Sequence, residues 1–105
     1  MIIIFTTTPT SLEAETLARG LVENRLAACV QVLPKMTSFY FWEGEVQREP
    51  EHLLLMKTSE AKYDELEKWL LEAHSYAEPE IVAVKAENVS EGYLEWLNGY
   101  LFNGQ

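Results

Sequence analysis

The chain has 105 residues, of which 48% are apolar, and a formal net charge of −9 from 17 acidic and 8 basic residues. This length predicts a single domain over residues 1–105. The acidic balance argues against nucleic acid and anionic membrane surfaces as partners, because both are bound through lysine and arginine. The single cysteine excludes an internal disulfide, and no apolar stretch reaches the length of a membrane span. We therefore expect a soluble, cytoplasmic protein.

Hydrophobic periodicity alternates between extended and helical patterns along the chain. The first strand is β-branched and apolar and ends at Pro9, and a capping-box pattern, Thr10 with Glu13, opens the first helix. Glu43 and Gly44 predict a turn within an aromatic run. The expected extended segments are 2–8, 26–34, 36–46, 51–59 and 79–87, and the expected helices are 11–24, 60–74 and 91 to about 99.

The order of these elements is β-α-β-β-α-β, followed by a terminal helix. Two βαβ units place two helices on one face of an antiparallel sheet, which is the ferredoxin-like arrangement of an α+β protein. The run 36–46 adds an extended hairpin arm, in which residues 39–42 (FYFW) are aromatic on both faces. A strand that is apolar on both faces is buried on both, whereas the helices cover only one. We therefore expect a second subunit to cover the arm.

Five segments together resemble one protein family, the CutA divalent-cation tolerance proteins. The segments are RLAACVQVLP, SFYFWEGEV, LLLMKT, HSYAEPEI and YLEWL, and they follow the order and spacing of that family. The resemblance implies a ferredoxin-like subunit assembled as a homotrimer, in the same structural group as the PII signalling proteins. It also implies that the arm pairs across the subunit interface. Some members of the family are described as binding copper.

The chain departs from the family pattern around its histidine motif. The usual motif is His-Pro-Tyr followed by an acid, whereas here Ser75 replaces the proline and Ala77 replaces the acid. Thr6 stands where some relatives carry a cysteine that has been proposed as a copper ligand. Ala73 precedes His74 where some relatives carry a second histidine. These changes remove ligands that a copper site in those relatives would use.

His74 closes the second predicted helix and has two interpretations. A cationic imidazole there would cap the last carbonyl groups of the helix. A neutral imidazole is also a good ligand for copper or zinc, so His74 and Glu80 are the candidate ligands for Cu(II) or another divalent cation. Glu80 can equally be an exposed carboxylate at a strand edge. The sequence carries no glycine-rich phosphate loop and no paired-cysteine zinc pattern, so we expect no organic cofactor.

A cleft between subunits is the alternative site, and it rests on the resemblance and on the architecture shared with PII proteins. Its candidate lining residues are Tyr40, Trp42, Lys57, Tyr76 and Glu80. Tyr40 and Trp42 can equally be structural residues of an interface. Lys57 can equally extend its side chain to solvent from the end of an apolar strand. The first function we expect is a trimeric cation-response protein that binds copper or another divalent metal weakly. The alternatives are a PII-like signalling module with a small ligand, and a trimeric scaffold with none. No catalytic set is complete, so we expect no enzyme.

Overall fold

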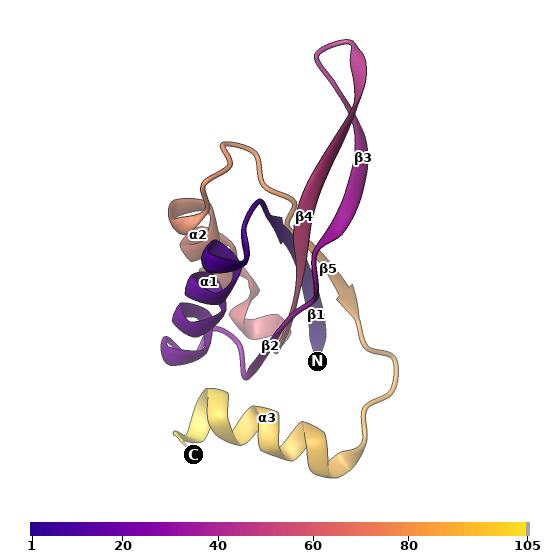
Figure 1. Ribbon diagram of the computed structural model, residues 1–105. Coiled ribbons are helices and arrows are strands. Elements are labelled where there is room, and N and C mark those ends of the chain that lie inside the picture. The colour runs from indigo at the N-terminus through magenta and orange to yellow at the C-terminus, as the bar shows by residue number, and fades with distance from the viewer. Residues whose placement is uncertain (105) are drawn as a thin grey trace.

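A computed structural model describes residues 1–104 and shows an antiparallel sheet covered on one face by helices, with a long hairpin projecting from the body (Figure 1). In the body of the sheet the strand order is β2-β4-β1-β5, and β3 pairs with the outer half of β4. This arrangement confirms the α+β, ferredoxin-like and PII-like description of the chain. The elements are β1 (Ile2–Thr8), α1 (Ser11–Glu23), β2 (Cys29–Val32), β3 (Met36–Trp42), β4 (Glu45–Thr58), the short 3-10 helix η1 (Glu60–Lys62), α2 (Tyr63–Ala73), β5 (Val82–Lys85) and α3 (Glu91–Asn103).

The hairpin turn confirms one expectation, and the strand that follows it corrects another. Glu43 and Gly44 both have positive φ, 49° and 82°, as the tight two-residue turn of a twisted hairpin requires. β4 then runs without a break through Pro50, where we expected a separate strand to begin at residue 51. At Pro50 the strand pairs with β3 alone, because pairing with β1 begins at His52. Pro50 has no N–H to donate, and β4 tolerates it here because one side of the strand has no neighbouring strand to bond.

β2 and β5 are shorter than the sequence predicts, because some residues expected in these strands do not pair within the sheet. The N–H groups of Leu26 and Ala27 both donate to the carbonyl of Leu21, which closes the turn after α1. β2 therefore begins only at Cys29. β5 pairs with just four residues of β1, so the segment before Val82 stays irregular and is free to form a loop.

The terminal helix is longer than predicted. Gly99 was expected to end it, but α3 continues to Asn103, and Gly104 adopts the left-handed conformation that terminates helices. Leu97 and Leu101 lie one turn apart and are both buried, together with Gly99. Burial of two leucines outweighs the cost of a glycine within a helix, which is about 1 kcal/mol.

The core lies between the sheet and the two helices α1 and α2. One face of the sheet contributes buried side chains from alternate positions of β1 and β4, and the helices contribute buried leucines. The largest members are Ile4, Leu21, Leu54, Met56, Leu66 and Leu70. On the opposite face of the sheet, Phe5 of β1 pairs with Leu55 of β4 on one side and with Val82 of β5 on the other, and Val82 is exposed. Helices α1 and α2 therefore leave this apolar face without cover.

Candidate functional site

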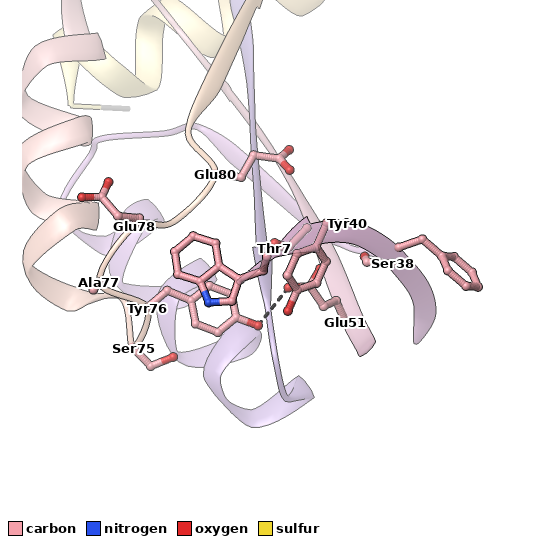
Figure 2. A pocket seen from close by; sticks show the side chains of 11 residues that line it. Thr7, Ser38, Tyr40, Glu51, Ser75, Tyr76, Ala77, Glu78 and Glu80 are labelled. Carbon is pink, nitrogen blue, oxygen red and sulfur yellow. Dashed lines mark hydrogen bonds between the residues drawn. The ribbon is translucent and has the colours of Figure 1, made fainter. Parts of the chain in front are cut away.

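A cavity of about 710 Å³ lies at the base of the hairpin arm (Figure 2). Its walls come from the end of β1, from β3, from β4 and from the loop between α2 and β5. The lining residues are Thr7, Ser38, Phe39, Tyr40, Trp42, Glu51, Ser75, Tyr76, Ala77, Glu78 and Glu80. The segments that meet here are far apart in the sequence, so the site depends on the sheet topology and on how the loop is held.

His74 holds this loop against the sheet. Its side chain is fully buried, and Nε2 lies 2.8 Å from the carbonyl oxygen of Thr7. Nδ1 accepts a hydrogen bond of 3.0 Å from the backbone N–H of Tyr76. These partners assign the proton of a neutral ring to Nε2, which donates to Thr7. The imidazole therefore does not cap α2, whose last turn is bonded instead by the backbone N–H of His74 to Leu70.

Glu13 ties the same loop to the first helix. Thr10 accepts a hydrogen bond from the backbone N–H of Glu13, as the capping-box pattern predicts. The Glu13 carboxylate does not return to Thr10; it accepts a 3.1 Å bond from the N–H of Ser75 and lies 3.5 Å from Nδ1 of His74. A proline at position 75, as in the usual family motif, would have no N–H to donate. The replacement by Ser75 thus provides a bond that this motif cannot form.

Tyr76 and Glu51 form the inner wall of the cavity. The Tyr76 hydroxyl donates a 2.8 Å bond to Oε2 of Glu51, drawn as a dashed line in Figure 2. Burial and this bond raise the pKa of Tyr76 well above its usual value, so the hydroxyl stays protonated and serves as a donor. Glu51 is only 7% exposed, although it was expected to lie at a strand start. Its burial follows from the continuous β4, which carries Glu51 beneath the loop.

The cavity is acidic and aromatic. Three carboxylates line it, those of Glu51, Glu78 and Glu80, and none of the lining residues described is a lysine, arginine or histidine. The aromatic rings come from β3 and from the loop, and they supply most of the apolar wall. Such a site repels anions and attracts cations.

The structure brings together four of the five residues predicted for the ligand cleft. Tyr40, Trp42, Tyr76 and Glu80 all line the cavity. Lys57 does not: it lies opposite Ile3 in the body of the sheet, with its ammonium group 5.6 Å from the centre of the Tyr93 ring. Three lining residues, Thr7, Ser38 and Glu51, were not singled out from the sequence, because their place depends on the register of β3 against β4 and on the path of the loop. Phe39 was noted as part of the aromatic run but not as a lining residue.

The two predicted metal ligands occupy different surroundings. Glu80 is exposed and lines the cavity, whereas His74 lies behind the loop with both ring nitrogens engaged. Within residues 1–104, no three His, Cys, Asp or Glu side chains gather closely enough to hold a metal ion. Thr6 is buried on the core face, away from the cavity, so the position of the cysteine in some relatives does not reach this site. Ligation of a metal by His74 stays a prediction, and it requires the imidazole to give up one of these bonds.

Comparison with known proteins identifies the family. Residues 2–99 match the family model described as CutA1 divalent ion tolerance protein. The chain belongs to the CutA family. It is 42% identical to the divalent-cation tolerance protein CutA of Thermus thermophilus over 95 residues, which cover 90% of this chain and 92% of that protein. It is 38% identical to a CutA homolog of Xenopus laevis, of which it spans 62%, so relatives of this kind are considerably longer.

Solved structures of CutA proteins share the fold of this chain. The Thermus thermophilus structure superposes with a TM-score of 0.89 at 42% identity, covering 92% of this chain and 95% of that one. A structure described as the periplasmic divalent cation tolerance protein CutA from Archaeoglobus fulgidus superposes with a TM-score of 0.92 at 33% identity, covering 96% and 99%. The fold of residues 1–104 is therefore that of a CutA protein. None of the helices in this part of the chain is long and apolar enough to cross a membrane.

Proposed function

We propose that this chain acts in divalent-cation tolerance as a homotrimer that binds divalent metal ions weakly, copper first. The observation that carries the proposal is the acidic cavity at the base of the arm, whose exposed rim carries the carboxylates of Glu78 and Glu80. Figure 2 shows the carboxylates of Glu78 and Glu80 pointing apart, so the rim offers one Cu(II) ion a single carboxylate from one chain and neither an imidazole nor a thiolate. Weak binding, with the remaining ligands from a neighbouring copy or water, follows from this ligand set. The proposal is of a binding role in the cytoplasm, without catalysis.

The trimer is supported by the apolar surface that one chain leaves open. Phe39, Phe41 and Trp42 on the arm are 66, 71 and 57% exposed. β5 is an edge strand with exposed valines, and the face of the sheet opposite α1 and α2 is apolar. Surfaces of this kind on a small domain are typical of interfaces between subunits. A homotrimer would place the arm of one copy against the body of the next and cover these surfaces.

The metal proposal is tested by titrating chelator-stripped protein with Cu(II) by calorimetry, with Zn(II) run in parallel. Glu78→Gln and Glu80→Gln retain size and remove one charge each, and we expect each to weaken Cu(II) binding. His74→Gln is the informative comparison, because it keeps a polar side chain at the loop and removes the imidazole. Retained binding in this variant supports a carboxylate site. No uptake at micromolar Cu(II) would contradict the proposal, and loss confined to His74→Gln would move the site to the histidine.

As a second function we propose a PII-like module that binds a small ligand, and this proposal rests on the size and walls of the same cavity. Its volume of about 710 Å³ lies within the range of small-molecule sites, and four of its lining residues are aromatic. A screen of metabolites by thermal shift tests this function. We expect compounds that bind the cavity to raise the melting temperature, and a screen in which nothing raises it would count against the module.

A further inference from the structure

We infer that the cavity at the base of the arm binds an organic ammonium ion, with its charged end at the Glu51 carboxylate and its carbon body against the rings of Tyr40 and Tyr76. The inference rests on the second proposed function, the small-ligand module, and names the class of its ligand. It does not rest on the metal proposal, which concerns the carboxylates at the rim.

The first step is the buried charge of Glu51. Its side chain is 7% exposed, and it forms no ion pair with any residue in the described part of the chain. Tyr76 donates to one carboxylate oxygen, Oε2, and residues 1–104 provide no hydrogen bond to the other. The free oxygen, Oε1, keeps access to solvent, because Thr6 Oγ1 is the buried side-chain oxygen without a hydrogen-bond partner among the described residues. A cation beside this mostly buried carboxylate would interact with it more strongly than it would in bulk water. The cavity gives that cation access.

The second step is the chemistry of the walls. Tyr40 and Tyr76 present aromatic rings, whose faces attract cations and pack against carbon. Glu78 and Glu80 lie on exposed parts of the lining and add negative charge at the entrance. A ligand that satisfies both features carries a positive charge and an apolar body, which describes an alkylammonium ion. A carboxylate or a phosphate would meet three negative groups.

The third step separates this ligand from a bare metal ion. A metal ion bound inside the cavity would need several oxygen or nitrogen ligands at about 2.0–2.6 Å from one point. The described residues supply no group of three such side chains. The cavity volume of about 710 Å³ is also that of a small-molecule site. Glu51 therefore suits one end of an organic cation better than a coordination sphere.

The position of Glu51 is fixed before any ligand arrives. His74 bonds Thr7 on β1 and the backbone of Tyr76, and this holds the Tyr76 ring 4.9 Å from the imidazole. The Tyr76 hydroxyl then orients the Glu51 carboxylate by a bond to one oxygen. The remaining oxygen is the acceptor that we assign to the ammonium group. Such preorganisation lowers the entropy lost on binding.

The experiment compares three four-carbon probes by calorimetry on the intact protein: n-butylammonium, n-butanol and butyrate. We expect saturable, millimolar binding of n-butylammonium and none of the other two. Glu51→Gln keeps an acceptor for Tyr76 and removes the charge, and it should weaken binding by about tenfold or more. Glu95→Gln, an exposed position on α3 outside the cavity, is the matched control and should bind as the wild type does.

Several results would overturn the inference. These are equal binding of n-butanol or butyrate, unchanged affinity in Glu51→Gln, or no binding of n-butylammonium at all. If Glu51→Gln fails to fold, Tyr40→Leu takes its place, because Tyr40 is 44% exposed and its ring supplies one wall; unchanged affinity there also overturns the inference. Cu(II) is titrated into the same samples. Copper uptake without ammonium binding refutes this inference and leaves the metal proposal standing. Ammonium binding without copper uptake supports this inference and contradicts the metal proposal.

Discussion

Replacing Tyr76 by phenylalanine isolates the bond on which the inner wall of the cavity depends. The substitution keeps the ring that packs 4.9 Å from His74 and removes only the hydroxyl that donates to Glu51. The carboxylate, 7% exposed, then loses its only hydrogen bond from the described residues. A hydrogen bond to a charged group contributes about 1.5–3 kcal/mol. We therefore expect Tyr76→Phe to lower the free energy of unfolding by about 2 kcal/mol per chain.

Urea denaturation followed by circular dichroism measures this loss. For a domain of this size the urea dependence of stability is about 1–2 kcal/mol per molar, so the midpoint should fall by about 1–2 M. All samples are compared at one protein concentration, because the proposed association would make the midpoint depend on concentration. Tyr40→Phe is the matched control: Tyr40 lines the same cavity, is 44% exposed, and its hydroxyl has no hydrogen bond to residues 1–104. If Tyr76→Phe is no less stable than Tyr40→Phe, the reasoning about Glu51 is wrong.

Three further predictions concern ionisation, assembly and the core. The hydrogen bond to Glu67, burial and nearby acidic charge raise the pKa of Tyr63 from 10.0 to about 12. The folded state therefore holds the Tyr63 proton more tightly than the unfolded state does. The stability that this protonated hydroxyl contributes is full below pH 10 and is lost as the pH rises through about 12. Absorbance titration of tyrosinate should show this late phase, and Glu67→Gln should move it to lower pH. The double variant Phe39→Ser, Phe41→Ser removes two exposed aromatic side chains and should shift the mass in light scattering from that of the proposed trimer towards that of a monomer. A mass equal to that of the wild type would show that the arm is not in the proposed interface. Leu54→Ala empties a fully buried position and should cost about 2–5 kcal/mol in denaturant unfolding, whereas a loss below about 1 kcal/mol would contradict the packing described.

The sequence predicted the elements whose signals are local. The apolar β-branched run of β1, the Thr10 cap and the turn at Glu43 and Gly44 are set by neighbouring residues, and all three are confirmed. The predictions of element boundaries were wrong where long-range contacts outweigh the local sequence pattern. A separate strand was expected to begin at residue 51, because the sequence does not show that β4 pairs first with β3 and then with β1. The last helix was expected to end near Gly99, because burial of Leu101 is not visible locally.

The candidate site was predicted in part for the same reason. Tyr40, Trp42, Tyr76 and Glu80 belong to motifs that stand out in the sequence, and they meet in the cavity. Glu51 has no such motif: an acid before an apolar strand is normally exposed, and only the path of the loop over β4 buries it. His74 was recognised as unusual, but its role as an anchor depends on the carbonyl of Thr7, 67 positions away in the sequence.

The most direct test of the proposed function locates the metal rather than measuring its affinity. Substoichiometric Cu(II), which is paramagnetic, is added to isotopically labelled protein while amide and indole signals are followed by NMR. The account predicts that signals from Glu78, Glu80 and the Trp42 indole broaden first. Broadening that begins instead at the amino terminus or around His52, neither of which lines the cavity, would contradict a metal site at the base of the arm.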